Sequence, residues 1–452
     1  RPLHLRVQDK EAYIEQVKVT TKSISPAVVQ IETAHHGGEV GVSVRLNGKE
    51  VANVTSDNQA ISIPNAQLWS DESPTLYTAV VELKKDGKIV ETQEVKFGIR
   101  TLEWNAKDGL LVNGKKTLLR GGCIHHDNGI LGAAEYDDAA YRRLQILKAY
   151  GFNAIRSAHN PCSEAVLRAS DELGFYVMDE LWDTWIIQKN PSDYANHFEK
   201  NWQSDARYLV KKDYNHPSVI MYSIGNEVAE PANAEGQAIE RNIISLLHEL
   251  DSSRPTTAGM NLMIQMLSTM GMNIFGEQQN AEKTKKMTSE EYNQMAQQSG
   301  MQMMQAVLAP QVDDICSPGL DMLDIAGYNY GNLRLGLDAQ LHPNRVTVGA
   351  ETFPYQIYDN WQLVEQIPNL IGDFMWTAWD YIGEVGIGAW YYDDNESAAF
   401  TKPFPWVLAG AGAIDLIGNP NAEAYMAKTT WLKDDRPYIT VAPIVPGKHL
   451  IK

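Results

Sequence analysis

The chain has 452 residues, of which 44% are hydrophobic and 21% charged, and its formal net charge is −18. This length predicts more than one domain, and the composition is typical of soluble globular proteins. The negative charge argues against nucleic acid or an anionic membrane as a partner, because phosphate groups would be repelled.

The sequence shows few features of membrane proteins, of disulfide-bonded or metal-binding proteins, or of secreted proteins. No apolar stretch reaches the ~18–20 residues of a membrane helix. The three cysteines, Cys123, Cys162 and Cys316, are odd in number and too widely spaced for a CxxC metal site. The first residues do not have the pattern of a signal peptide. Cytoplasmic, periplasmic and secreted locations all stay open.

Short runs in which apolar and polar residues alternate fill residues 1–101. Asn47-Gly48 and Asp86-Gly87 each separate two such runs, and both dipeptides favour tight hairpin turns. Short alternating strands with regular turn signals are typical of an antiparallel sandwich. We therefore predict an immunoglobulin-like antiparallel β-sandwich over residues 1–101.

After Trp104, strand-like runs alternate with helical patterns. In the stretch 137–150, Ala140, Leu144 and Leu147 share one face, and Gly174 closes a second helix over 164–173. A parallel sheet closed into a (β/α)8 TIM barrel over residues 102–433 is the simplest arrangement that buries all the strands. The eight strand-like runs are 117–121, 153–157, 175–180, 219–225, 256–260, 324–330, 346–351 and 372–379.

Two further segments depart from this alternation. Residues 260–320 lie between strands five and six and hold 10 of the 15 methionines. We expect a mostly helical insertion on a βα loop, where barrels carry specificity, although soft packing would also explain the methionines. Residues 434–452 resemble the start of a following strand-rich domain, and both ends of the chain read as interior sequence of a longer polypeptide.

Polar side chains gather where the predicted strands end, which is where barrels carry their catalytic groups. Neither a nucleophile elbow nor a phosphate loop accompanies them, and no cofactor is implied. The residues at these strand ends are His125, His126, Asp127, Arg156, His159, Asn160, Asp179, Glu180, Asp183, Asn226, Glu227, Tyr328, Tyr330, Glu351, Trp376, Trp379 and Asp380.

Glu227 and Glu351 follow strands four and seven, so they can face each other across the mouth of the barrel. Two carboxylates with aromatic neighbours fit acetal hydrolysis, in which one protonates the leaving oxygen and the other attacks or activates water. A single glutamate at a strand end is more often an ion-paired surface residue. The pair, with its flanking motifs, favours the catalytic interpretation.

Several longer motifs carry a resemblance to a known family. They are LWSDESPTLYTAVVEL and FGIRTLEW, then LLVNGKKTLLRGGCIHHD, GFNAIRSAHNPCSEAVLRASDELGFYVMDE, HPSVIMYSIGNE, GAET and GDFMWTAWDYIGE. Together they resemble glycoside hydrolase family 2, which contains bacterial β-galactosidases, β-glucuronidases and β-mannosidases. The resemblance implies a retaining exo-β-glycosidase that acts on terminal β-linked sugars of an oligosaccharide or glycoside without a cofactor.

The resemblance also implies roles at the reacting centre. Glu227 matches the acid/base and Glu351 the nucleophile of a double displacement. Asn226 matches the residue that binds the sugar 2-hydroxyl. Arg156 matches the arginine beside the nucleophile, and we expect its charge to keep Glu351 ionised. Tyr330 matches the tyrosine that orients the nucleophile.

Three further residues match parts of the family's sugar pocket. His125 and His159 match histidines that hold sugar hydroxyls, and Trp376 matches a stacking platform. His126, Asp127, Glu180 and Glu384 could equally be structural or solvated side chains.

Departures from the family pattern bear on the sugar. The stretch WTAWDYIGEVGIG resembles β-galactosidase-type members, so we predict β-D-galactosides as substrates. Pro354 occupies a position where the β-galactosidase branch often has a histidine. Trp185 lies near the position of the histidine in that branch's magnesium site, so we expect no metal. The alternatives are a β-glucuronidase, whose Asn-x-Lys pair is not evident, a β-mannosidase, and a non-catalytic carbohydrate-binding barrel. A metal hydrolase is disfavoured because the side chains of His125 and His126 point apart.

Overall fold

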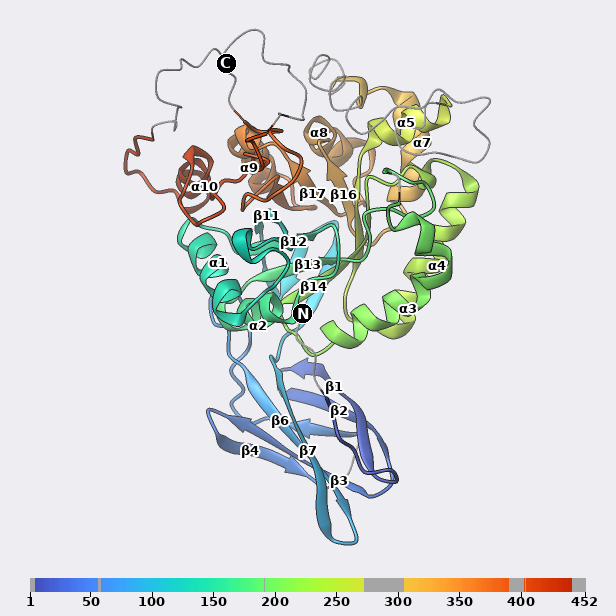
Figure 1. Ribbon diagram of the computed structural model, residues 1–452, viewed down its shortest axis with the longest axis vertical. Coiled ribbons are helices and arrows are strands. Elements are labelled where there is room, and N and C mark those ends of the chain that lie inside the picture. Colours follow the sequence, from blue (N-terminus) through green and yellow to red (C-terminus); the bar gives the residue numbers. More distant parts are fainter. Residues whose placement is uncertain are drawn as a thin grey trace.

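The computed structural model describes residues 5–55, 58–190, 192–271, 305–389, 402 and 404–440. Figure 1 shows a sandwich of strands at the lower end and, above it, a barrel ringed by helices. The predicted fold class is confirmed. Within the described residues, no helix is long and apolar enough to span a bilayer.

Two antiparallel sheets form the sandwich, one with the order β1-β2-β5 and one with the order β4-β3-β6-β7. Both predicted hairpin turns are present, because Asn47 and Gly48 have φ angles of 49° and 77°, and Asp86 and Gly87 of 53° and 76°. Positive φ at both central residues is what a type I′ turn requires. The strands are β1 (Tyr13–Ile24), β2 (Ala27–His36), β3 (Glu39–Leu46), β4 (Lys49–Val54), β5 (Gln59–Ser62), β6 (Tyr77–Lys85) and β7 (Lys88–Phe97).

A closed barrel of eight parallel strands, in the order of the chain, forms the second body. Every predicted strand is found, and the fifth has the predicted bounds. A small antiparallel sheet of β8 (Leu102–Asn105), β9 (Gly109–Val112) and β10 (Lys115–Lys116) precedes it. The barrel strands are β11 (Leu119–His125), β12 (Ala154–Ala158), β13 (Tyr176–Glu180), β14 (Val219–Asn226), β15 (Thr256–Met260), β16 (Ala326–Asn329), β17 (Thr347–Thr352) and β18 (Leu370–Met375).

Helices pack around the outside of the barrel, where they bury one face each. The predicted helix at 164–173 has the predicted bounds: the Ser163 side chain accepts from Val166 N at its start, and Gly174 ends it with a φ of 73°. The described helices are α1 (Asp137–Ala149), α2 (Glu164–Leu173), α3 (Ala195–Asp213), α4 (Ala234–Leu250), α5 (Leu262–Thr269), α7 (Pro310–Leu320), α8 (Asn332–Leu341), α9 (Ile357–Gln366) and α10 (Ala422–Leu432), with short 3-10 turns at Gly129–Leu131, Glu230–Ala232 and Pro354–Gln356.

Strand periodicity decides which side chains reach the barrel interior. On β13, Val177 packs with the outer helices, whereas Met178 belongs to the inner cluster. The next residue, Asp179, is bonded to Lys212 of α3, and Glu180 is bonded to Arg156 inside the barrel. Because successive side chains of a strand alternate in direction, Glu180 is directed into the site and Asp179 away from it.

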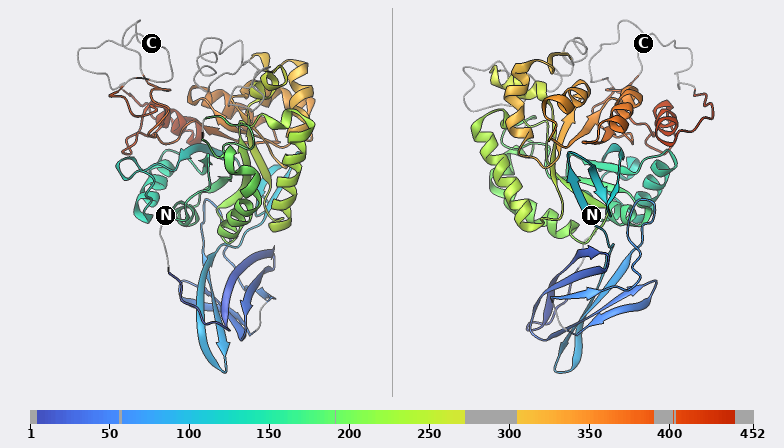
Figure 2. Two further views of the ribbon diagram at one scale, coloured as in Figure 1. Left: turned by 45° about the vertical axis from the view of Figure 1, so that its right-hand side comes forward. Right: turned by 180° about the vertical axis from the view of Figure 1, so that it is seen from behind.

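The sandwich is fixed to one end of the barrel. Arg100 donates to the carbonyl oxygens of Pro217 and Val219, each at 2.6 Å, and Asn215 donates to Val17 O at 2.7 Å. Both views of Figure 2 show the sandwich at this end, with the α5–α7 region at the other. The sandwich therefore faces the end of the barrel where β14 begins.

Two of the sequence expectations fall partly outside the described residues. The segment between β15 and β16 begins with α5 and ends with α7, so its described parts are largely helical. Residues 272–304 lie outside the described residues. Residues 434–440 hold no helix or strand, and residues 441–452 are again outside.

Candidate active site

The carboxyl ends of the barrel strands bring all eight predicted site residues into one connected network. Arg156, at the centre, is fully buried and donates to four side chains, of which the sulfur of Cys123, at 3.9 Å, is the most distant. Its guanidinium lies 2.8 Å from Glu180 Oε2, 2.9 Å from Glu351 Oε2 and 2.8 Å from Asn226 Oδ1. Burial alone would lower the pKa of Arg156, but the carboxylates outweigh it and the pKa is raised.

Glu351, the predicted nucleophile, is 5% exposed and lies at the end of β17. Burial raises its pKa to about 7, against the opposing effects of Arg156, His159 and a hydrogen bond from Tyr330. The sequence analysis expected the charge of Arg156 to keep Glu351 ionised. The arginine is in the expected place, but it is shared with other acceptors and does not offset the loss of water around the carboxylate.

Glu227, the predicted acid/base, is half-buried and directly follows β14. Its φ angle is 46°, and its backbone N–H donates to Gly259 O at 2.7 Å, which holds the turn in place. Its side-chain Oε1 accepts a hydrogen bond from Asn261 Nδ2 at 2.8 Å. The carboxyl group is therefore anchored on one oxygen.

Asn329 stands between the two glutamates, and the sequence analysis did not single it out. Its Nδ2 atom lies 3.4 Å from Glu227 Oε1, 3.3 Å from Glu351 Oε2 and 2.8 Å from Asn226 Oδ1. One amide nitrogen thus lies within 3.4 Å of an oxygen of each carboxylate, so the two groups share a single donor. The available signal was its place at the end of a strand, one residue before Tyr330.

Two histidines and a tryptophan pack together beside this pair. The rings of His159 and Trp376 are parallel, with centroids 5.2 Å apart, and His125 meets Trp376 edge-on at 5.1 Å. Burial, with a smaller contribution from His159, lowers the pKa of His125 to about 3, so His125 is neutral. Trp376 is only 7% exposed, and its Nε1 donates to the Tyr381 hydroxyl at 3.2 Å.

Glu180 serves the site indirectly. It is fully buried and accepts hydrogen bonds from Arg156, from Ser223 Oγ at 2.6 Å and from His159 Nδ1 at 2.7 Å. Burial would raise its pKa, but Arg156 and His159 outweigh burial and the pKa is lowered. Glu180 therefore stays ionised and fixes the orientation of a histidine and an arginine that line the site.

Other strand-end residues turn away from the pair. His126 lies 3.2 Å from Glu135, whereas its neighbour His125 packs against Trp376, so the two histidines diverge as expected. Asp127 joins two loops, because it accepts from Gly129 N at 2.9 Å and from Ile382 N at 2.5 Å. These contacts show structural partners for His126 and Asp127.

Asp183 and Lys189 form the outer edge of the network. Asp183 Oδ1 accepts from Lys189 Nζ at 2.6 Å and from Asn226 Nδ2 at 3.0 Å. Burial would raise the pKa of Asp183, but Lys189 and His159 outweigh it and the pKa is lowered. Farther out, Glu384 accepts a hydrogen bond from the Tyr381 hydroxyl, which links it to Trp376.

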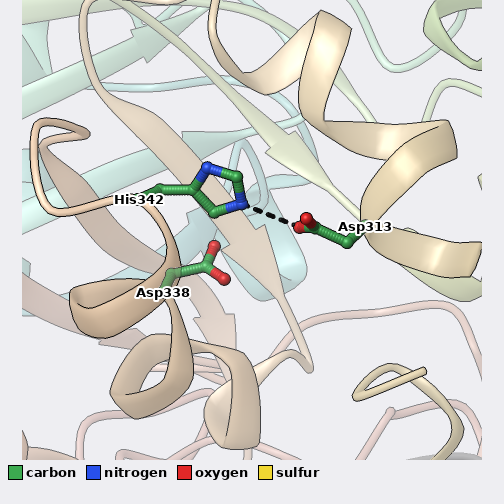
Figure 3. A group of neighbouring side chains, drawn as sticks. All are labelled: Asp313, Asp338 and His342. Atoms are coloured by element: carbon green, nitrogen blue, oxygen red, sulfur yellow. Dashed lines mark hydrogen bonds and ion pairs between the residues drawn. The ribbon is translucent and has the colours of Figure 1, made fainter. Parts of the chain in front are cut away.

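One other cluster has the spacing of a metal site. Ligand atoms of Asp313, Asp338 and His342 lie within 4.8 Å of one another, on and beside α7 and α8 (Figure 3). Arg334 pairs with both aspartates, and Arg345 lies 2.9 Å from Asp338. Two guanidinium groups would repel a cation from these oxygens. The cluster instead fastens α7 to α8.

Two sequence profiles and a solved structure resemble the chain. The profile described as glycosyl hydrolases family 2 matches residues 4–100, and that of the TIM barrel domain of glycosyl hydrolases family 2 matches residues 105–317. A family 2 glycosyl hydrolase structure from Bacteroides cellulosilyticus is 34% identical, with a TM-score of 0.76, and the match covers 97% of this chain and 53% of that one.

Two curated relatives carry named activities. A β-galactosidase of Bacteroides ovatus is 28% identical over 85% of this chain and 48% of its own length. A β-glucuronidase of Streptococcus agalactiae is 29% identical over 58% of this chain and 46% of its own length. The chain spans about half the length of these relatives. Because the two family profiles together match most of the chain, it belongs to family 2 of the glycosyl hydrolases.

Proposed function

We propose that this chain carries the catalytic centre of a retaining exo-β-glycosidase, with Glu351 as nucleophile and Glu227 as acid/base. The observation that supports this most directly is the amide nitrogen of Asn329, which lies within 3.4 Å of an oxygen of each glutamate. Two carboxylates that share one amide donor are near enough to fit a double displacement, whose carboxyl groups lie ~5–5.5 Å apart.

The first half of the reaction forms a covalent intermediate. An oxygen of ionised Glu351 attacks the anomeric carbon, while the bond from that carbon to the leaving oxygen breaks. Glu227 gives its proton to the leaving oxygen. Asn226, held by Arg156 and Asp183, presents its amide to the sugar 2-hydroxyl, where a hydrogen bond strengthens in the transition state.

The second half restores both glutamates. Glu227, now ionised, takes a proton from water, and the water oxygen bonds to the anomeric carbon. Glu351 leaves as a carboxylate. Each displacement inverts the anomeric carbon, so the product keeps the β configuration of the substrate. Arg156 and Tyr330 stabilise the negative charge of Glu351 when it is released.

For the sugar, we propose a neutral hexopyranoside, with β-D-galactosides preferred. Among the described residues of the site, four carboxylates face two permanent cations, and both cations are already ion-paired. Because both cations are already paired with carboxylates of the protein, a sugar carboxylate would have to compete with those carboxylates for them. The carboxylates are Glu180, Asp183, Glu227 and Glu351, and the cations are Arg156 and Lys189.

A β-glucuronidase is the second candidate, because a curated relative carries that name. A panel of 4-nitrophenyl β-galactoside, β-glucuronide, β-mannoside and β-glucoside distinguishes these activities, and we expect the galactoside to react fastest. Proton NMR of the first product should show the β anomer. An α anomer would exclude Glu351 as a nucleophile, and sugar binding without turnover would favour a carbohydrate-binding barrel.

A further inference from the structure

Asn261 joins the acid/base glutamate to the first helix after β15. Its Oδ1 atom accepts from the backbone N–H groups of Met263 at 3.1 Å and Ile264 at 3.4 Å, so it caps the N-terminus of α5. Its Nδ2 atom lies 2.8 Å from Glu227 Oε1. One side chain therefore starts a helix and donates to the glutamate.

The two halves of this amide cannot exchange places. Only the oxygen can accept the two N–H groups of the helix, so the NH₂ group must point toward Glu227. Asn261 is 5% exposed, and its helix cap restricts rotation of the side chain. The donor is thus held in position before any substrate binds.

The side-chain amides of Asn261 and Asn329 both donate to the same oxygen of Glu227, Oε1. Asn329 Nδ2 lies 3.4 Å from Oε1, on which Asn261 already donates. Among the side chains of the described residues, none donates a hydrogen bond to Oε2. An oxygen that accepts amide N–H groups is disfavoured as the site of a proton, because the proton would face those donors.

We infer that Asn261 is a positioning residue that fixes the Glu227 carboxyl so that Oε2 carries the transferable proton. The inference rests on the proposed function and deepens it. In the first step, the O–H bond at Oε2 breaks, and the proton passes to the leaving oxygen as Glu351 bonds to the anomeric carbon. In the second step, Oε2 takes a proton back from water.

Acid catalysis matters in proportion to the basicity of the leaving group. A dinitrophenolate departs without a proton, whereas an alkoxide needs one as the bond breaks. If Glu227 were held loosely, the hydrolysis of alkyl glycosides would therefore be slower, whereas the hydrolysis of dinitrophenyl glycosides would be almost unchanged. A general loosening of the fold would slow both to the same extent.

Two substitutions remove the donor and keep the cap. Serine is an N-cap residue but is too short to reach Glu227, so N261S tests the lost hydrogen bond. N261D keeps size and cap, and places an oxygen that repels Oε1 at the same point. Asn233 is the matched control, because it caps α4 in the same way by accepting from Glu235 N and Gly236 N.

The measurement is kcat/KM for 2,4-dinitrophenyl, 4-nitrophenyl and methyl β-galactosides with wild type, N261S, N261D and N233S. We expect N261S to lower kcat/KM for the methyl galactoside on the order of 10- to 100-fold, and N261D to lower it further. The dinitrophenyl value should fall less than about threefold. N233S should leave all three substrates within about twofold of wild type.

The outcomes separate two kinds of failure. If N261S and N261D slow the three substrates equally, or leave the methyl galactoside unchanged, the positioning role of Asn261 is overturned while the proposed function stands. If wild type hydrolyses none of the β-glycosides of the panel, the proposed function fails and the inference fails with it. Thermal melting of each variant shows whether it is folded. If N261S does not fold, N261D serves as the test.

Discussion

Two buried arginines, Arg100 at the sandwich end of the barrel and Arg156 at the other end, are held by opposite kinds of partner. At the sandwich end, Arg100 donates to the carbonyl oxygens of Pro217 and Val219, and its charged neighbour of largest effect is another arginine, Arg254. Burial, followed by Arg254, lowers the pKa of Arg100 to about 9. At the other end, Arg156 is surrounded by carboxylates and its pKa is raised.

We infer from this difference that the sandwich end of the barrel contributes mainly to stability, whereas the other end carries the functional site. Neutral carbonyl groups satisfy Arg100 and have no chemistry to perform, so we expect that end to hold the two bodies together. The other end collects carboxylates in excess of cations and leaves Glu351 with a pKa raised to about 7. Such a site is costly to fold and fits general acid–base chemistry, because its protonation states can change near neutral pH.

The largest expected effect follows from the role proposed for Glu351, that of the nucleophile. E351Q should lower kcat for 4-nitrophenyl β-galactoside by about 10⁴-fold or more, because the amide cannot form the covalent intermediate. Its melting temperature should not fall, since a buried carboxyl that is costly to ionise has been replaced by a neutral group of the same size.

E365Q provides the control, because Glu365 lies on α9 and pairs with Lys433 at 3.1 Å, outside the site. Its kcat should stay within about twofold of wild type, since exposed ion pairs contribute little. Residual activity of E351Q above a tenth of wild type would remove Glu351 from the mechanism.

The second effect concerns Glu227, the proposed acid/base. E227A should lower kcat/KM for methyl β-galactoside by about 10²- to 10⁴-fold, and dinitrophenyl β-galactoside should be affected far less. Azide should accelerate turnover of the dinitrophenyl substrate, because it attacks the covalent intermediate without needing a base. NMR should show a β-galactosyl azide.

E351A is the matched comparison for azide rescue. There the azide replaces the nucleophile itself, so a single displacement should give the α-galactosyl azide. If both variants give the same anomer, the roles of Glu227 and Glu351 have been assigned wrongly.

The third effect concerns the sandwich end of the barrel, where we expect a substitution to lower stability without changing kcat. R100M removes two hydrogen bonds from a charged donor to Pro217 and Val219, which should destabilise the protein by about 2–3 kcal/mol. Denaturant unfolding measures this loss. R100K keeps the charge with fewer donors and should lie between R100M and wild type.

In both Arg100 variants, kcat measured well below the melting temperature should match wild type within about twofold, since Arg100 does not contact the site. A tenfold fall in kcat with unchanged stability would show that the two ends are coupled, and would contradict the separation drawn between them.

Much of the fold could be predicted from the sequence because local patterns determine it. Asn47-Gly48 and Asp86-Gly87 form the expected turns, since few other dipeptides accept two positive φ angles. The run at 256–260 becomes β15 with the expected bounds, because both its ends are marked by a change of pattern. Strand order then follows, since parallel strands joined by helices pack in sequence.

The site could be predicted only in part, because distances between side chains do not follow from spacing along the chain. Glu227 and Glu351 stood out through their motifs, whereas Asn329 and Asn261 are ordinary amides at strand ends until the fold brings them to the glutamates. The raised pKa of Glu351 was also missed, since burial around a carboxyl group cannot be seen in a sequence.

The smallest expected effect is a shift in the pH profile. As the proposed nucleophile, Glu351 must be ionised, so kcat/KM should rise about tenfold per pH unit up to its pKa, which burial raises to about 7. The Tyr330 hydroxyl donates to Glu351 and lowers that pKa. Y330F removes this hydrogen bond, so the pKa of Glu351 should rise and the acidic limb should move to higher pH, by about half a unit to one unit.

The profile is measured as kcat/KM for 2,4-dinitrophenyl β-galactoside between pH 4 and 9, because this substrate needs little help from Glu227. At pH 6, Y330F should be about three- to tenfold slower than wild type, whereas the two should converge above pH 8. Y355F is the control, since Tyr355 is 63% exposed and its ring packs on Phe353 instead of reaching Glu351. If the acidic limb of the wild-type profile lay near pH 4.5, Glu351 would have the ordinary pKa of a glutamate. The charge of Arg156 would then outweigh burial, and the contrast drawn between the two ends of the barrel would be contradicted.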